Sequence, residues 1–381
     1  MQETYIKKDS FEDKTFVNQI DFDFLNKIES LRKKNEIIKE FDQEDLSIID
    51  KAIEDCKRTT LSKDSEFKIK NNSYEEIKLM EDKNIIKYIL HRYKYEIFPD
   101  KKILNKYPPL LQIEPSSVCN FRCVFCFMTD ENFSQKKSKH MGVMSLDMYK
   151  KIVDQIEGKI QFITLASRGE PLVNKQIGQM LEFSKNKFLG LKINTNASLL
   201  NEKLIHDILT NDVLTVVFSA DAAEKKLYEK LRVRGNFDRV IKNIKLFKDI
   251  KEKHYPKKKI ITRVSGVKFS ENQNFNEVSN FWNEHVDQVA FVKYNPWENS
   301  YEKKDNDITT PCSDLWRRMF IWWDGKANPC DVDYKSHLNV GNVNKTDIEK
   351  IWNGKDYNKL RELHVNQNRQ KKKPCSSCFV T

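Results

Sequence analysis

The chain of 381 residues has no run of 18 apolar residues, and its first 14 residues, MQETYIKKDSFEDK, contain no apolar signal region. These absences argue against a membrane-spanning helix and against secretion, so we expect a cytoplasmic protein with no membrane partner. Internal repeats and long low-complexity tracts are also missing. No basic stripe is interleaved with aromatic residues, so nucleic acid is not an expected partner.

Cysteine is absent from the long stretch between Cys126 and Cys312. Seven of the eight cysteines fall into two groups on either side of that gap, and only Cys56 is left over. In a large chain that is expected to be intracellular, such groups indicate metal binding or catalysis more than a disulfide framework. Cys56 shares a helical apolar stripe with Ile49 and Ile53, which predicts a small buried side chain.

The formal net charge is +11, and its excess of Lys and Arg lies entirely in residues 101–381. The basic residues form short clusters, for example at 257–259 and 371–373. Most of this excess is interpreted as solvated surface. A second interpretation is attraction of an anionic substrate or of an acidic flavodoxin or ferredoxin that supplies electrons.

The pattern of elements divides the chain into three predicted domains. Residues 1–105 are predicted to be mostly helical, and Pro99 and the pair Pro108-Pro109 mark the end of this region. The region could cap a barrel, bind a partner or recognise a peptide. Residues 106–294 alternate strands with helices, which predicts a parallel sheet covered by helices. Residues 295–311 read as a polar linker, and the third domain, 295–381, carries the last four cysteines.

The six expected strands of the second domain are 110–114, 162–166, 190–195, 213–219, 259–267 and 286–292. Expected helices include one capped by Ser145, one over 174–187, one over 201–209, one over 223–252 with an interruption near Gly235, and one over 274–284. In parallel sheets ligands collect at the carboxyl ends of the strands. The first cysteines and several polar residues follow strand ends, so they should meet at one mouth.

The first cysteine group, C-x3-C-x2-C, comprises Cys119, Cys123 and Cys126. Three thiolates on one tight loop suit a cubane iron–sulfur cluster with one iron open to a small molecule. A zinc site or a plain electron-transfer cluster is the alternative for this motif alone.

Residues 110–294 resemble the radical S-adenosylmethionine (radical SAM) enzymes, because several features of that family occur in order. The resemblance implies a partial (β/α)6 TIM-like barrel within an α/β fold. It implies that the three cysteines bind a 4Fe-4S cluster and that SAM binds its open iron. The SAM-binding positions that it implies are Phe125, Gly169, Glu170, Pro171, Asn196, Ser219 and Asp221. Arg232 and Arg263 are candidates for the SAM carboxylate or the substrate.

The last four cysteines, Cys312, Cys330, Cys375 and Cys378, follow the spacing C-x17-C-x44-C-x2-C. This resembles the short twitch form of the SPASM extension, which holds one auxiliary 4Fe-4S cluster. Four thiolates would ligate that cluster fully and make it an electron conduit. A four-cysteine zinc site is the alternative.

The resemblance implies one-electron cleavage of SAM and removal of a hydrogen atom from the substrate by a 5′-deoxyadenosyl radical. Radical SAM epimerases often return hydrogen from a protein thiol, and no cysteine is left in the barrel for that role. We therefore expect a dehydrogenase that oxidises a secondary alcohol of a sugar, cyclitol or nucleotide sugar. Asp331, next to Cys330, is the expected base, with an ordinary turn residue as its alternative interpretation.

Three alternatives stay open from the sequence. One is a radical SAM maturase that modifies a ribosomal peptide. A second is a sugar epimerase. The third is a zinc- or cluster-bearing binding module with no catalytic activity.

Overall fold

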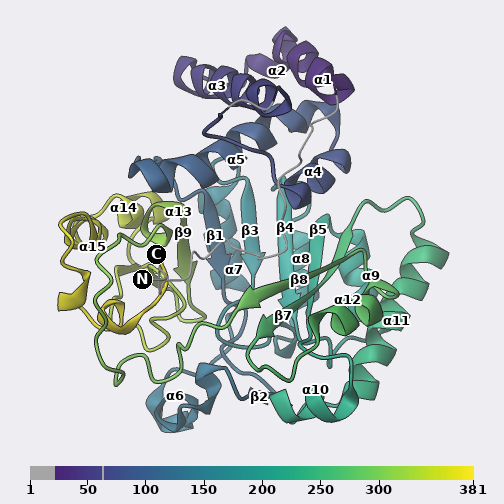
Figure 1. Ribbon diagram of the computed structural model, residues 1–381, viewed down its shortest axis with the longest axis vertical. Helices are drawn as coiled ribbons and strands as arrows, with labels where there is room; N and C mark the ends of the chain where they lie inside the picture. Colours follow the sequence, from purple (N-terminus) through teal and green to yellow (C-terminus); the bar gives the residue numbers. More distant parts are fainter. Residues whose placement is uncertain (1–21, 62–63) are drawn as a thin grey trace. The chain divides into compact units, whose positions relative to one another are not determined.

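The computed structural model describes residues 22–61 and 64–381 (Figure 1). The first 21 residues of the predicted helical region lie outside the described residues. Contacts within the chain separate two compact units, one that includes residues 22–105 and one that includes 106–381. Among the described residues, no helix has both the length and the apolar character needed to cross a membrane.

The described part of the first unit is helical, as the apolar spacing predicted. Its helices are α1 (Phe22–Arg32), α2 (Asn35–Ile38), α3 (Gln43–Thr60), α4 (Asn71–Lys78) and α5 (Asp82–Lys101). Asp42 caps α3 by accepting a hydrogen bond from the backbone N–H of Asp45. Cys56 is fully buried on α3, and burial raises the pKa of its thiol to about 12, so it is inert at neutral pH.

Six parallel strands form the body of the second unit, in the order β1-β3-β4-β5-β7-β8 (Figure 1). They are β1 (Leu110–Ile113), β3 (Phe162–Leu165), β4 (Gly190–Thr195), β5 (Val213–Ser219), β7 (Ile261–Lys268) and β8 (Gln288–Lys293). The predicted α/β class with a parallel sheet is thus confirmed. The sequence located each strand within about two residues because its branched and aromatic residues form short runs bounded by polar turns.

Helices follow the strands along the chain. They are α6 (Glu131–Ser134), α7 (Leu146–Ile156), α8 (Ile177–Phe183), α9 (Glu202–Thr210), α10 (Lys225–Leu231), α11 (Phe237–His254) and α12 (Phe275–Asn283). Ser145 caps α7 as predicted, by accepting from Met148 N–H. The helix expected over 174–187 is shorter, because Asn174 uses its side-chain oxygen to hold the turn at Gln176 and so delays the start of α8.

The interruption predicted near Gly235 holds a feature that the sequence did not reveal. A two-residue strand, β6 (Arg232–Val233), lies between α10 and α11 and pairs antiparallel with β2 (Arg122–Cys123). Short 3-10 turns complete this unit: η1 (Phe127–Thr129), η2 (Lys136–Ser138), η3 (Pro171–Val173), η4 (Arg369–Lys371) and η5 (Cys375–Ser377).

The C-terminal part extends the sheet, which the sequence did not predict. Strand β9 (Arg318–Ile321) pairs parallel with β1, and β10 (Lys326–Asn328) and β11 (Gly341–Asn342) follow antiparallel. Three helices, α13 (Asp314–Arg317), α14 (Ile348–Trp352) and α15 (Lys355–Val365), complete it. The edge of β1 is therefore covered, as exposed strand edges usually are.

Side chains alternate between the two faces of the parallel strands. Those in the apolar core with the helices include Ile163, Ile193 and Val216. The opposite face, which the strands curve around, carries the polar residues Gln112, Thr164, Lys192, Thr215, Arg263 and Gln288 among apolar ones such as Val217, Ile261 and Phe320. The sheet thus presents a mixed interior surface and an apolar exterior surface that packs on helices.

Candidate active site

The stretch Cys119–Cys126, called the cluster loop from here on, follows β1 through a five-residue connection. Backbone contacts hold it at the strand ends. The N–H of Glu170 donates to Val118 O at 3.0 Å, and the N–H of Val124 donates to Leu231 O at 3.0 Å. The pairing of β2 with β6 sets Cys123 opposite Arg232. The loop is thus tied to the ends of two other elements of the barrel.

The three thiols of the cluster loop lie near one another. Burial raises the pKa of Cys119 to about 12, and Glu170 and Cys123 add to the rise. The pKa of Cys126 is also raised, first by burial and then by Cys123 and Cys119. A bound metal must displace these protons, because the thiolate is the ligand. A three-thiol donor set on one loop fits a cluster that leaves one iron open.

The Gly169-Glu170-Pro171 motif lies directly against the connection to the cluster loop. A Cβ on Gly169 would collide with Ser116 O and would lie 2.6 Å from Val118 O. Glycine is required here by that close backbone approach. Glu170 is buried and accepts hydrogen bonds from Leu172 N–H at 3.1 Å and from Thr195 Oγ1 at 2.7 Å.

Burial raises the pKa of Glu170 to about 7, and the hydrogen bonds that its carboxylate accepts oppose that rise. One of those hydrogen bonds comes from the N–H of Asn196, 2.7 Å from Oε2. The ends of β3 and β4 are therefore joined through one carboxylate. The structure brings these two predicted residues together, as their strand-end positions suggested.

Asn196 also reaches the cluster loop. Its Nδ2 donates to Oδ1 of Asn120 at 3.0 Å, and Asn120 in turn donates to Ser198 Oγ at 2.8 Å. Neither Asn120 nor Ser198 was identified from the sequence. The position of Asn120 inside the cysteine motif was the available signal for the first of them.

Asp221 and Arg232 form a buried ion pair, with Arg232 Nε 2.6 Å from Asp221 Oδ2. Asp221 Oδ1 accepts the N–H of Val267 at 2.7 Å. The guanidinium of Arg232 lies 5.6 Å from the ring centre of Phe125, and its Nη1 lies 3.9 Å from Cys123 Sγ. Both predicted charged residues thus lie beside the cluster loop, paired with each other; their contact with SAM stays a prediction.

Ser219 and Arg263, two further predicted positions, differ in where they lie relative to the residues around the cluster loop. Ser219 ends β5 and lies opposite Ser265 of β7, at the level of the strand ends. Arg263 is two residues earlier on β7, and its Nε and Nη2 donate to Gln288 Oε1 at 2.8 and 2.6 Å. Arg263 therefore belongs to the interior face of the sheet and not to the rim where the other residues gather.

Tyr228 on α10 is a site residue that the sequence did not suggest. Its side chain is fully buried, and its hydroxyl has no hydrogen-bond partner among the described residues. Burial raises the pKa of this phenol, while Arg232 lowers it and Asp221 raises it again. A buried hydroxyl without a partner is costly, so its presence here fits a group that binds beside it.

The four C-terminal cysteines come from separate segments that fold together. Burial raises the pKa of Cys375, and Cys378 and Cys312 add to the rise, so these thiols are neighbours. Cys330 and Cys312 both raise the pKa of the buried Tyr357. This donor set fits a fully ligated iron–sulfur cluster.

Two buried side chains organise the C-terminal cysteines, and the sequence did not point to either. Arg369 donates to Cys375 O, Cys378 O, Thr310 O and Val380 O at distances of 2.9 to 3.3 Å. His364 on α15 accepts the N–H of Cys312 at its Nδ1, 3.1 Å away. Together they fix the backbone at both ends of the cysteine set.

Asp331 and Asp333 follow Cys330 but differ in their surroundings. Asp331 is partly exposed beside Cys330, and its role as a base stays a prediction. Asp333 is buried and accepts from Leu338 N–H, His337 N–H and Tyr301 Oη at 2.7 to 2.9 Å. Asp333 thus anchors the turn that follows Cys330.

The arrangement of these thiols bears on the zinc alternative. In the part of the chain that the structure describes, no three His, Cys, Asp or Glu side chains are set to hold a single metal ion. A tetrahedral zinc site needs such convergence around one ion.

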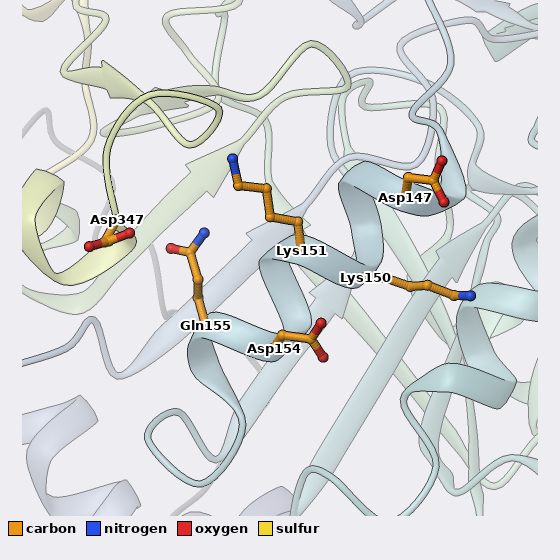
Figure 2. A pocket seen from close by; sticks show the side chains of 6 residues that line it. All are labelled: Asp147, Lys150, Lys151, Asp154, Gln155 and Asp347. Atoms are coloured by element: carbon orange, nitrogen blue, oxygen red, sulfur yellow. The ribbon is translucent and has the colours of Figure 1, made fainter.

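A groove on the outer side of the sheet is unrelated to these residues. Figure 2 shows it between α7 and the segment that enters α14; it is lined by Asp147, Lys150, Lys151, Asp154, Gln155 and Asp347. Gln155 Oε1 accepts Ile348 N–H at 2.9 Å, and Lys151 donates to Asn344 O at 3.1 Å. These contacts attach the C-terminal part to α7, so we interpret the groove as a seam between packed elements.

Comparison with known families agrees with this geometry. Residues 113–264 match the profile of the radical SAM superfamily, and residues 312–379 match that of the SPASM iron–sulfur cluster-binding domain. The chain belongs to the radical SAM enzymes and carries a C-terminal SPASM iron–sulfur domain. Its cofactors are therefore a SAM-binding 4Fe-4S cluster, SAM, and auxiliary iron–sulfur.

Solved structures share the fold at low sequence identity. SuiB of Streptococcus suis is 17% identical with a TM-score of 0.55, over 96% of this chain and 97% of that one. The anSMEcpe protein with bound AdoMet is 16% identical with a TM-score of 0.53, over 71% and 88%. Mycofactocin maturase MftC of Mycobacterium tuberculosis is 24% identical over 135 residues, 35% of this chain and 33% of that protein. The first curated relatives are matched over only 33% to 42% of their own length.

Proposed function

We propose that this radical SAM enzyme oxidises a secondary alcohol of a sugar, cyclitol or nucleotide sugar, and that one auxiliary 4Fe-4S cluster accepts the second electron. The observation that carries the proposal is the distribution of thiols. The chain has no cysteine between Cys126 and Cys312, and the remaining thiol, Cys56, is buried in a helix of the other unit. A second cysteine set beside the barrel offers an electron acceptor instead of a hydrogen donor.

The overall change balances as a two-electron oxidation. The alcohol carbon gives one hydrogen atom to the deoxyadenosyl group of SAM, which leaves as 5′-deoxyadenosine, with methionine as the other product. When bound at Cys312, Cys330, Cys375 and Cys378, the auxiliary cluster would supply the acceptor for the second electron, and a base would take the hydroxyl proton as the ketone forms. One external electron, from a flavodoxin or ferredoxin in our proposal, is needed for each SAM that is cleaved.

When bound, the reduced cluster and SAM supply the hydrogen-abstracting chemistry. Cys119, Cys123 and Cys126 of the cluster loop would hold the cluster. Glu170 fixes the backbone of Asn196 and Leu172 around that space. The ion pair of Arg232 with Asp221 places a cation beside Cys123, where it favours the thiolate form.

The interior face of the sheet supports a polar substrate. Gln112, Thr164, Thr215 and Gln288 offer hydrogen-bonding groups, and Lys192 and Arg263 add cations. Polyols and nucleotide sugars present hydroxyl and phosphate groups that match these side chains, of which Arg263 and Gln288 already bond to each other. Asp331, adjacent to Cys330, stays the predicted base.

Peptide maturation is the second candidate, because mycofactocin maturase MftC is among the relatives. An epimerase is the third, and it would need a hydrogen donor other than a barrel thiol. The products separate the three classes: a ketone for the dehydrogenase, a modified peptide for the maturase, and an inverted centre carrying solvent hydrogen for the epimerase.

The deciding experiment is an anaerobic assay of the reconstituted protein with SAM, dithionite and a panel of nucleotide sugars, cyclitols and short peptides in D2O. We expect 5′-deoxyadenosine to rise only with a polyol substrate, together with a carbonyl product in equal amount. Formation of 5′-deoxyadenosine only with a peptide would contradict the proposal. A sugar product that keeps its alcohol and gains deuterium at carbon would do so as well.

A further inference from the structure

Glu114 and Arg168 form a buried ion pair at the carboxyl ends of two neighbouring strands. Glu114 follows β1 and Arg168 follows β3, and their side chains are 0% and 2% exposed. Arg168 Nε lies 2.7 Å from Glu114 Oε2, and Nη2 lies 2.6 Å from Oε1. This two-point contact fixes the orientation of the guanidinium plane.

The same two side chains also contact the C-terminal part. Arg168 Nη1 donates to Tyr334 O at 2.8 Å, and its guanidinium carbon lies 4.2 Å from the ring centre of Trp322. Glu114 Oε1 accepts the N–H of Trp323 at 3.2 Å. One ion pair therefore joins the barrel strands to two segments on either side of Cys330.

Tyr334 carries the connection onward to the cluster loop. Its ring stacks on Phe127 with centres 4.9 Å apart, and its hydroxyl donates to Asp130 Oδ2 at 2.7 Å. Lys335 Nζ lies 2.6 Å from the same oxygen of Asp130. Phe127 directly follows Cys126, and Tyr334 is four residues after Cys330. The two cysteine-bearing segments are thus in contact.

Stability alone does not account for this ion pair. Removing two charges from water costs several kcal/mol per ion, and apolar residues of similar volume often serve the fold as well or better. What a fixed guanidinium adds is geometry, because its donors must meet one carboxylate and one carbonyl at the same time. The pair therefore specifies where Tyr334 lies relative to the strand ends.

We propose that Arg168, paired with Glu114, is a positioning residue that holds the segment after Cys330 against the cluster loop and so sets the placement of the auxiliary cluster relative to the SAM-binding cluster. The inference rests on the proposed function only in requiring both clusters to be present. Electron transfer between centres depends on their separation, so this placement determines whether the second electron can leave the substrate site by that route.

The test uses the full chain, anaerobically reconstituted and reduced with dithionite, without substrate. Pulsed and continuous-wave EPR report the magnetic interaction between the two reduced clusters, and the Cys375→Ala variant supplies the spectrum without that interaction. For Arg168→Gln we expect iron content near the wild-type value and loss of the defined interaction. Arg168→Lys should fail to restore it, because a lysine cannot make both contacts.

Arg361→Gln is the matched control. Arg361 is buried in the same C-terminal part and donates to Leu315 O and Trp352 O, without touching the barrel strands. We expect it to lower thermal stability and leave the inter-cluster interaction at its wild-type value. An unchanged interaction in Arg168→Gln, or an equal loss in Arg361→Gln, would overturn the proposal.

A second variant decides the matter if Arg168→Gln fails to retain iron. Glu114→Gln removes the carboxylate that orients Arg168 and keeps the size of the side chain. This variant should partly weaken the magnetic interaction between the two clusters. An unchanged interaction would count against the proposal. The iron content of the wild-type protein is measured before any variant is made. A content of only about four irons per chain would show that the second cluster is absent and would contradict the proposed function itself.

Discussion

The two cysteine sites of this protein are built in opposite ways. The cluster loop gathers three thiols within eight consecutive residues, and strand ends hold it from outside. The C-terminal site gathers four thiols from positions spread over 67 residues, and two buried basic side chains, Arg369 and His364, hold their backbone together. The first site depends on local spacing and the second on completed folding.

The sites also share a device. Each lies beside a buried carboxylate that accepts three hydrogen bonds from two segments of the chain, Glu170 at the first site and Asp333 at the second. Burial raises the pKa of each to about 7. The difference teaches that a local motif needs a scaffold only for orientation, whereas a dispersed one needs it for assembly.

The largest expected effect comes from Cys123→Ala. Removing one of three ligands should abolish 5′-deoxyadenosine formation from SAM and dithionite altogether, because the open-iron cluster no longer forms. Iron content should fall from about eight to about four per chain. Retention of SAM cleavage would show that the cluster loop is not the SAM site and would break the comparison.

Cys375→Ala tests the C-terminal site while the cluster loop stays intact. We expect SAM cleavage to continue, because the cluster loop is intact, while ketone formation falls at least tenfold for lack of an electron acceptor. The measurement is the ratio of 5′-deoxyadenosine to oxidised product. An unchanged ratio would mean that the second electron leaves by another route.

Arg369→Gln tests whether the dispersed site depends on its buried anchor. Loss of the guanidinium leaves several carbonyl oxygens without a donor, each costing about 1 to 3 kcal/mol. We expect reduced iron retention at the C-terminal site alone, seen as loss of the auxiliary EPR signal with SAM cleavage preserved. Equal iron loss from both sites would contradict independent assembly.

Gly169→Ala should affect the cluster loop through backbone sterics. The added Cβ meets only backbone atoms of Ser116–Val118, so we expect a cost of about 1 to 3 kcal/mol in thermal unfolding of the apoprotein. Gly178→Ala, within α8, is the control, because the added Cβ would meet only the flexible side chain of Asp207. If both variants behave alike, the close approach at Gly169 is not what holds the loop.

The most gradual effect is the pH dependence from Asp333. Its pKa is raised by burial, against hydrogen bonds from Leu338, Tyr301 and His337 and the charge of Arg168. The folded state therefore keeps a proton that the unfolded state has lost between about pH 4 and 7. The free energy of unfolding should fall with rising pH in that window, by up to about 1.4 kcal/mol per unit.

Asp333→Asn should remove this slope in the apoprotein. The measurement is the difference between wild-type and variant unfolding free energies from pH 4.5 to 8, because other groups titrate equally in both. A difference that stays constant across the range would show that Asp333 is ionised throughout.

Much of the fold could be predicted from the sequence because it depends on local pattern. The strand runs, the Ser145 cap and the three-cysteine spacing each act within a few residues, and the chemistry of a motif at a strand end follows from the parallel topology. The short pair β2–β6 could not be predicted, since two residues in each strand carry too little pattern. The added strand β9 could not be predicted because its partner β1 is far from it in the sequence.

By itself the sequence determined the fold class and the family resemblance, and it predicted which residues carry the chemistry: seven cysteines, a Gly-Glu-Pro turn and polar strand ends. Only the tertiary structure decided how these residues pair. It set Arg232 against Asp221 and Cys123, kept Arg263 inside the sheet, and joined Arg168 to Glu114 and Tyr334. The physical reason is that buried charges must find partners, and those partners come from whichever segments the fold brings within hydrogen-bond distance.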